Sequence, residues 1–219
     1  MLFTEKLHQL SRPLWLKSIH HPFIKQLVSG TLPLSQFRFY LIQDRYYLNE
    51  FSQLENLIAD KLHNKKAVNF LKREAQELKN GEIQERKTFF KKLQITPEKI
   101  KLTPVSPTVY NYVNHMYACL YRNNIQTAVA ALLPCPWLYN EIGKNLAQKS
   151  SPISFYAQWL SFYGSADYSS NTQQMIDLTE QVADTADKTK KQEMTQAFIK
   201  SSYFELNYWD MALQKESWD

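Results

Sequence analysis

Glycine and cysteine are both scarce in this chain of 219 residues, and each shortage narrows the possible folds. Its four glycines are far fewer than usual, whereas folds with many strands need glycine in their tight turns. Its two cysteines, Cys119 and Cys135, do not make a disulfide framework and fit a reducing cytoplasm. Because a chain of this length buries roughly 70% of its unfolded surface on folding, it needs neither a disulfide nor a metal for stability.

Long apolar runs are also missing. Residues 1–15 carry charged and polar side chains where a signal peptide needs an unbroken apolar stretch. No run elsewhere approaches the roughly 20 apolar residues that a membrane-spanning helix needs. We therefore expect a soluble cytoplasmic protein that has no membrane partner.

The formal net charge of +5 does not by itself indicate binding to nucleic acid. The lysines concentrate between Lys61 and Lys101, where glutamates are mixed with them, and such blended charge is typical of a solvated helix face. The sequence also has no fingerprint of a known nucleic-acid-binding module. We therefore expect no nucleic-acid partner.

Several catalytic motifs are absent. The chain has no glycine-rich phosphate loop, no CxxC pair and no HExxH motif. Asp60 and His63 have a helical i+3 spacing, but a metal needs more ligands than these two. We expect the five histidines to be structural or surface residues and predict no metal site.

The chain consists of successive segments with helical periodicity, and convincing period-2 strands are absent. The expected helices span about 4–28, 35–62, 65–91, 107–122, 124–132, 136–148, 152–163, 172–185 and 188–214. Apolar stripes that follow the 3.6-residue period predict an all-α fold, a single compact helical bundle over residues 1–219.

Cys135 is the strongest candidate for a reactive group. It lies in the run Leu133-Pro134-Cys135-Pro136-Trp137-Leu138-Tyr139, and a proline directly after it is typical of the first residue of a helix. This predicts Cys135 as the N-cap, beside unpaired N–H groups and the positive end of the helix dipole, which favour the thiolate. Tyr139 falls on the same helical face, so its phenol is expected beside the sulfur.

Two carboxylates stand on apolar helix faces. Asp44 shares a stripe with Phe37, Tyr40, Leu41, Tyr47, Leu48, Phe51 and Ile58, and Glu205 shares one with Phe198, Ser202, Tyr208, Trp209 and Ala212. A buried carboxylate is costly, so it has either a partner or a function. Each residue alone is explained more simply by a hydrogen bond from a core tyrosine or tryptophan. The two together with Cys135 favour a shared polar pocket.

Tyrosine is abundant, with thirteen in the chain. Those expected to face the core are Tyr47, Tyr112, Tyr139, Tyr163 and Tyr208. Each alone fits ordinary core packing, but tyrosine also stacks on flat rings and forms hydrogen bonds at its tip. With two carboxylates and a thiol, these phenols would suit a small, flat heterocycle whose amine or ring nitrogen interacts with a carboxylate.

Four segments together resemble a known family. They are HPFIKQLVSGTLPLSQFRFYLIQDRYYLNEF (21–51), LLPCPWLYNEIG (132–143), YAQWLSFYGSADY (156–168) and FELNYWD (204–210). Their order and content, from about residue 8 to 212, are similar to the thiaminase II (TenA) family of the haem-oxygenase-like superfamily. The resemblance implies a compact all-helical homotetramer without a metal or organic cofactor. It also implies an enzyme of thiamine salvage that hydrolyses 4-amino-5-aminomethyl-2-methylpyrimidine, or more slowly thiamine, to 4-amino-5-hydroxymethyl-2-methylpyrimidine.

In this resemblance Cys135 matches the family's nucleophile and Glu205 its acid/base partner. The implied reaction begins when the Cys135 thiolate adds to an electron-poor pyrimidine carbon while Glu205 protonates a ring nitrogen. The ring then expels the amine from its exocyclic methylene, water replaces the amine, and the thiolate leaves. Glu205 needs a raised pKa for this role, which burial on an apolar face would supply.

The resemblance also implies the substrate-binding residues. Asp44 matches the aspartate that anchors the nitrogen edge of the ring. The implied pocket includes Tyr139 and Tyr163 as polar residues and Tyr47 and Tyr112 as aromatic lining. Tyr208, also expected at the substrate, and Tyr168 stand where the family often has phenylalanine, and their hydroxyls put the fine substrate preference in question.

Two alternatives remain open from the sequence. A redox relative, such as a haem oxygenase or a quinone-cofactor synthase, is one; haem ligation needs a histidine on a core face, for which His20 and His21 are poor candidates. A non-catalytic pyrimidine-binding regulatory protein is the other, and it would keep the pocket without needing the thiol. The joint presence of cysteine and carboxylates favours the enzyme.

Overall fold

The computed structural model describes residues 1–146, 149 and 151–218, except for the side chains of 81–87. Every regular element in these ranges is a helix, so the predicted all-α class is confirmed. The elements are α1 Phe3–Ile19, α2 Pro22–Ser29, α3 Leu34–Ala59, α4 Lys65–Lys92, α5 Pro97–Leu102, α6 Pro107–Ala118, the π-helical turn η1 Cys119–Asn123, α7 Ile125–Leu132, α8 Pro134–Leu146, α9 Ser154–Tyr163, α10 Ala166–Asp184 and α11 Lys188–Gln214.

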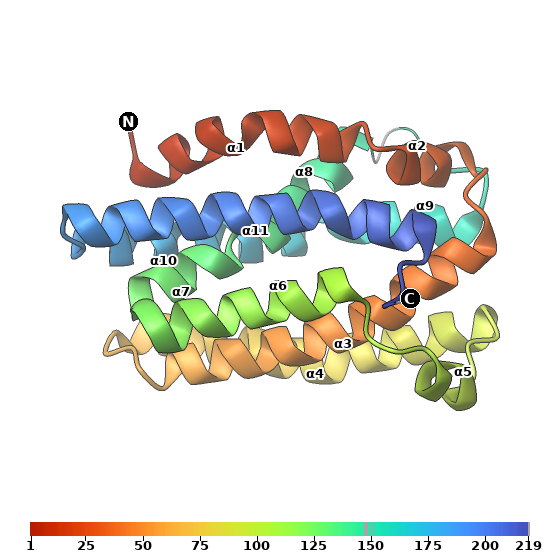
Figure 1. Ribbon diagram of the computed structural model, residues 1–219, viewed down its shortest axis with the longest axis horizontal. Coiled ribbons are helices and arrows are strands. Elements are labelled where there is room, and N and C mark those ends of the chain that lie inside the picture. Colours follow the sequence, from red (N-terminus) through yellow and green to blue (C-terminus); the bar gives the residue numbers. More distant parts are fainter. Residues whose placement is uncertain (147–148, 150, 219) are drawn as a thin grey trace.

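Helix α11 runs along the middle of the molecule (Figure 1). It packs against α1 on one side and against α6 and α7 on the other. Helices α3 and α4 form a hairpin at the edge of the molecule, while α8 and α9 pack against each other at the rear of this view. Side chains from all these layers meet in one large buried cluster, so the faces that carry the predicted site residues turn toward the same interior.

Side-chain caps define the starts of several helices. Ser106 accepts a hydrogen bond from the Val109 amide at the start of α6, and Asn124 accepts one from the Thr127 amide at the start of α7. These caps satisfy amides that have no partner inside the helix. They fix the starting points of two helices that pack against α11.

One predicted helix is two helices. The expected helix over 4–28 is interrupted at residues 20 and 21, and the ring of His21 accepts a hydrogen bond from the Phe23 amide as the N-cap of α2. Pro22 occupies the first position of α2, where its missing N–H removes nothing from the helix. The prediction of one helix was therefore wrong.

Other boundaries also differ. Helix α5 was not predicted; Thr96 caps it and Pro97 begins it, which is an ordinary helix start. Helix α10 begins at Ala166, before the predicted 172, because Ser165 accepts a hydrogen bond from the Tyr168 amide. Across the part of the chain that the structure describes, each helix is too short or too polar to span a bilayer.

Candidate active site

A pocket opens between helices α3, α4, α8, α9 and α10, and its cavity volume is about 90 Å³. The described residues that line it are Asp44, Leu48, Phe51, Glu55, Phe70, Glu74, Leu78, Cys135, Pro136, Tyr139, Tyr163, Tyr168, Asn171, Thr172 and Met175. Four of the residues predicted for the site, Asp44, Cys135, Tyr139 and Tyr163, therefore share this pocket.

Cys135 lies in the first turn of α8 but is not its N-cap. Helix α8 begins at Pro134, and only Leu133, which has right-handed helical backbone angles, separates it from α7. The N-cap prediction was wrong because Pro134 can begin a helix as well as Pro136 can. Cys135 is 9% exposed, and Tyr139, one turn further along α8, lines the pocket with it as expected.

Glu205 lies in the middle of α11 and is 1% exposed. The Tyr112 hydroxyl donates a 2.8 Å hydrogen bond to its Oε1. Burial raises the pKa of Glu205 to about 8, the negative charge of Asp44 raises it too, and hydrogen bonds from Tyr112 and Cys135 act in the opposite direction. Near neutral pH this carboxyl group can both hold and release a proton, and it contacts the Cys135 thiol.

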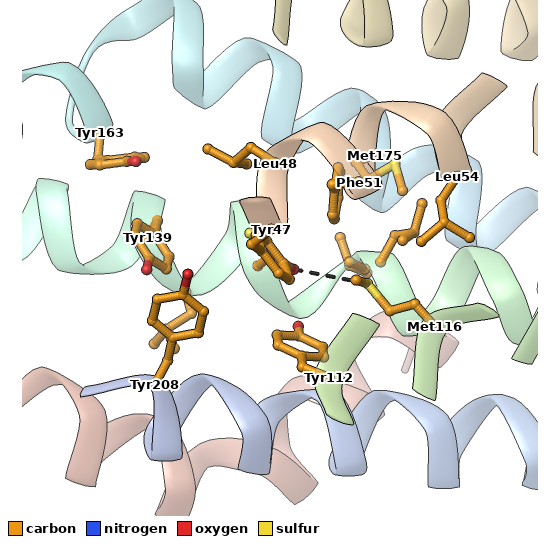
Figure 2. Close-up of a cluster of buried hydrophobic side chains, with 14 of the residues drawn as sticks. Tyr47, Leu48, Phe51, Leu54, Tyr112, Met116, Tyr139, Tyr163, Met175 and Tyr208 are labelled. Carbon is orange, nitrogen blue, oxygen red and sulfur yellow. Dashed lines mark hydrogen bonds between the residues drawn. The ribbon is translucent and has the colours of Figure 1, made fainter. Parts of the chain in front are cut away.

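Buried phenols surround the carboxyl group. The rings of Tyr47 and Tyr112 are 5.0 Å apart, and the ring of Tyr208 lies 5.8 Å from that of Tyr47. Figure 2 shows these three tyrosines and Tyr139 gathered between the helices. Burial raises the pKa of Tyr47 and of Tyr112 well above the usual range, and for Tyr112 the charge of Glu205 adds to this effect. Both phenols therefore stay protonated and can donate hydrogen bonds.

Tyr40 was not predicted as a site residue but is part of this network. It is fully buried, and its hydroxyl donates a 3.3 Å hydrogen bond to the hydroxyl of Tyr139. Burial raises its pKa well above the usual range, and the charge of Asp44, one turn away on α3, raises it further. Its position on the same apolar stripe as Asp44 was the signal that could have identified it.

Close contact between α8 and the end of α9 positions Tyr163. A Cβ atom added to Gly143 of α8 would lie 2.3 Å from the Gly164 nitrogen and 2.4 Å from the Tyr163 carbonyl carbon. Only glycine allows this approach. The Asn140 side chain donates a 2.9 Å hydrogen bond to the Tyr163 carbonyl oxygen, and the ring of Tyr163 lies 4.8 Å from that of Tyr139.

The structure brings all eight predicted site residues into one region with two parts. Asp44, Cys135, Tyr139 and Tyr163 line the pocket. The others, Tyr47, Tyr112, Glu205 and Tyr208, lie buried behind it. Contact between Cys135 and Glu205 joins the two parts.

Two further carboxylates line the same pocket and were not predicted as site residues. Glu55 follows Asp44 by eleven residues and continues the i+4 and i+7 spacing of the apolar stripe on α3, which was a usable signal. Glu74 lies on α4, in a segment rich in charge, where nothing in the pattern distinguished it.

His20 and His21 are poorly placed to bind haem. His20 is exposed. Both ring nitrogens of His21 are occupied, because Nδ1 accepts from the Phe23 amide and Nε2 lies 3.0 Å from an oxygen of Asp210.

Fold and site together define an all-helical protein in which a thiol and a buried carboxyl group meet at one pocket. The chain belongs to the TENA/THI-4/PQQC family, whose model matches residues 8–215.

Similar proteins match over nearly their whole length. The aminopyrimidine aminohydrolase of Bacillus subtilis (strain 168) is 31% identical over all of this chain and 92% of its own length. The aminopyrimidine aminohydrolase of Helicobacter pylori is 29% identical over 98% of this chain and 100% of its own length. The solved structure of a TenA homologue from P. horikoshii OT3 is 30% identical, covers 98% of this chain and 99% of its own, and has a TM-score of 0.89.

Proposed function

We propose that this protein is an aminopyrimidine aminohydrolase, or thiaminase II. It hydrolyses 4-amino-5-aminomethyl-2-methylpyrimidine to the 5-hydroxymethyl compound and ammonia, and acts on thiamine more slowly, in thiamine salvage. The observation that carries the proposal is the contact between Cys135 and Glu205 at a pocket that Asp44 also lines. The names of the relatives in Bacillus subtilis and Helicobacter pylori support the same substrate class.

Cys135 and Glu205 perform the first step of the proposed reaction. The thiol gives its proton to Glu205, the sulfur forms a bond to an electron-poor ring carbon, and Glu205 passes the proton to a ring nitrogen. A carboxyl group with a pKa of about 8 suits this exchange, because it can accept and donate near neutral pH.

The next steps release the amine and restore the ring. Electrons of the dearomatised adduct form the exocyclic double bond as the C–N bond breaks, and ammonia leaves with the proton it carries. Water adds to the methylene carbon and loses a proton, and the ring becomes aromatic again as the C–S bond breaks. The thiolate then recovers its proton.

The other residues bind and orient the ring. Asp44 accepts a hydrogen bond from the exocyclic amine at the nitrogen edge of the pyrimidine. Tyr139 and Tyr163 line the pocket beside it with their polar tips. Tyr112 holds the Glu205 carboxyl group by its hydrogen bond, and Tyr47 and Tyr208 form the wall behind.

An assay of ammonia release tests the proposal. We expect the purified protein to consume the aminomethylpyrimidine and to form ammonia and the hydroxymethyl product in equal amounts. Binding without turnover would support the regulatory alternative and overturn the proposal. Absorbance of the purified protein in the haem region would support the redox alternative.

The resemblance also supports a cytoplasmic homotetramer. Size-exclusion chromatography with light scattering should give four times the mass of one chain, and a monomer would contradict this part of the proposal.

A further inference from the structure

Asn140 is a buried polar residue close to the pocket, but it is not among the described residues that line it. It lies on α8 directly after Tyr139 and is 3% exposed. Its side-chain nitrogen donates two hydrogen bonds of 2.9 Å, one to the Tyr163 carbonyl oxygen at the end of α9 and one to the Ser169 hydroxyl in α10. Both N–H groups of the amide are therefore used, and they reach two other helices.

The partners of Asn140 fix the direction of these hydrogen bonds. A carbonyl oxygen can only accept, so the Tyr163 carbonyl needs an N–H group opposite it. The Ser169 hydroxyl donates its own proton to the Ser165 carbonyl oxygen at 2.8 Å, so it accepts from Asn140. An amide side chain meets both demands, whereas a carboxylate of the same shape meets neither.

Close packing holds the same backbone group. The Tyr163 carbonyl belongs to the last turn of α9, where carbonyl groups have no partner inside the helix. One turn past Asn140, a Cβ atom added to Gly143 would lie 2.4 Å from the Tyr163 carbonyl carbon. A hydrogen bond and a close contact from α8 thus fix one peptide group, which leaves the end of α9 little freedom to slide along α8.

This junction joins three helices that surround the pocket. Cys135 and Tyr139 come from α8, and Tyr163 is the last residue of α9. Tyr168 lies in the first turn of α10. The ring of Tyr163 lies 4.8 Å from that of Tyr139, beside it in Figure 2, and 5.0 Å from that of Tyr168. The position of the Tyr163 backbone therefore sets where the pocket tyrosines lie relative to Cys135.

We infer that Asn140 is a positioning residue for substrate binding, which holds Tyr163 against Tyr139 without itself touching the substrate. The inference rests on the proposed function, in which Tyr163 contacts the pyrimidine ring. Proton exchange depends on Cys135 and Glu205, and a residue of α6 holds the Glu205 carboxyl group. Asn140 therefore acts on the binding of the ring more than on the proton exchange.

The test is the steady-state kinetics of Asn140→Asp on the aminomethylpyrimidine. Aspartate has the same shape but no donor, and its negative charge faces the Tyr163 carbonyl oxygen. We expect KM to rise about tenfold while kcat stays within about threefold. The change in rate near pH 8 should remain where it is in the wild type. A purely structural role would lower the amount of folded enzyme, and with it the apparent kcat, and would leave KM unchanged.

A double-mutant cycle shows whether Asn140 acts through Tyr163. Tyr163→Ala alone should raise KM, because it removes a contact to the ring. Adding Asn140→Asp to Tyr163→Ala should then raise KM by less than about twofold, because the side chain that Asn140 positions is gone. A full tenfold increase in this background would overturn the inference.

Ser151→Ala is the matched control. Ser151 is 5% exposed, and its hydroxyl donates a 2.9 Å hydrogen bond to the Leu27 carbonyl oxygen in the last turn of α2. It is thus also a buried donor to a carbonyl near a helix end, but it lies outside the pocket lining. Ser151→Ala should lower the midpoint of urea unfolding and leave KM unchanged.

The outcomes separate this inference from the proposed function. A wild-type protein that releases no ammonia from the aminomethylpyrimidine overturns the proposed function and the inference with it. An active wild type combined with an Asn140→Asp variant whose KM changes no more than that of Ser151→Ala overturns the inference alone. If Asn140→Asp does not fold, Asn140→Ala replaces it, because it removes both donors without adding a charge. The same rise in KM is expected, and an unchanged KM counts against the inference.

Discussion

The two cysteines of this chain are both buried, yet they lie in opposite chemical surroundings. Cys119 is 5% exposed and Cys135 is 9% exposed, so burial alone does not separate them. Cys119 has a histidine beside it and Cys135 a glutamic acid. By residue type, the cysteine–histidine pair looks more like a nucleophile with its base.

The environment of Cys119 makes that pair unreactive. Its sulfur lies 3.8 Å from both ring nitrogens of His115, one helical turn earlier. Burial raises the pKa of Cys119 to about 11 and lowers the pKa of His115 to about 4, so both groups are neutral near pH 7. Cys119 packs with Ala131 and Ala197 and is not among the described residues that line the pocket.

Cys135 differs in its partner and in its access. Burial keeps a proton on Glu205 up to a pKa of about 8, instead of removing it as it does for His115. Cys135 also opens onto a pocket with Asp44 and three tyrosines. A partner able to exchange a proton near neutral pH, together with space for a substrate, therefore identifies the reactive cysteine.

Exchanging each sulfur for oxygen should separate the two cysteines most strongly. We expect Cys135→Ser to lower kcat/KM by at least about 10³-fold, because serine is a much weaker nucleophile beside a carboxyl group. Cys119→Ser should stay within about twofold of wild type. Ammonia release measures both. Near-normal turnover by Cys135→Ser would rule out covalent catalysis.

The second largest difference in activity is expected between variants of Glu205 and His115, the residues beside the two cysteines. Glu205→Gln is expected to lower kcat by about 10²-fold or more and to remove the change in rate near pH 8, because the amide cannot carry the proton. His115→Gln should leave the pH profile of the enzyme in place. An unchanged profile in Glu205→Gln would exclude this residue from proton transfer.

The same two groups should make stability depend on pH in opposite directions. The raised pKa of Glu205 means that between pH 4.5 and pH 8 the folded chain binds more protons than the unfolded chain, so stability falls as pH rises through this range. The lowered pKa of His115 means that the unfolded chain binds more protons between pH 6.5 and pH 4, so stability falls as pH drops there.

Urea unfolding of the variants at several pH values tests this. In the wild type the free energy of unfolding should fall by up to about 4 kcal/mol as the pH rises from 4.5 to 8, and Glu205→Gln should remove this fall. His115→Gln should remove a smaller fall in the free energy of unfolding as the pH drops from 6.5 to 4, because His115 is less buried than Glu205. Wild-type and Glu205→Gln curves that run parallel from pH 4.5 to pH 8 would contradict the raised pKa.

Much of this fold and site could be predicted from the sequence because helix periodicity assigns faces. The stripes around Asp44 on α3 and Glu205 on α11 are buried as predicted. Periodicity does not determine which faces meet. The contact between Cys135 and Glu205 joins residues seventy positions apart and depends on how α8 packs against α11.

The errors of prediction have local physical causes. Pro134 and Pro136 can each begin a helix, so the pattern alone did not decide where α8 starts. Glu55 lies on the stripe of Asp44, but a charged residue near a helix end is usually solvated and was not assigned to the site. Such residues become visible only when the pocket between helices is known.

The smallest effect should come from the hydroxyl that holds Glu205. The 2.8 Å hydrogen bond that the Tyr112 hydroxyl donates lowers the pKa of Glu205, and Tyr112→Phe removes this donor. Without it that pKa should rise, and the limb of the pH profile near 8 should move to higher pH by about one unit, with kcat falling about tenfold or less. Tyr117→Phe is the matched control, because its hydroxyl donates a 2.9 Å hydrogen bond to Glu50, away from the pocket. A limb that moves equally in both variants, or toward lower pH in Tyr112→Phe, would mean that Tyr112 does not set the proton affinity of the group beside Cys135.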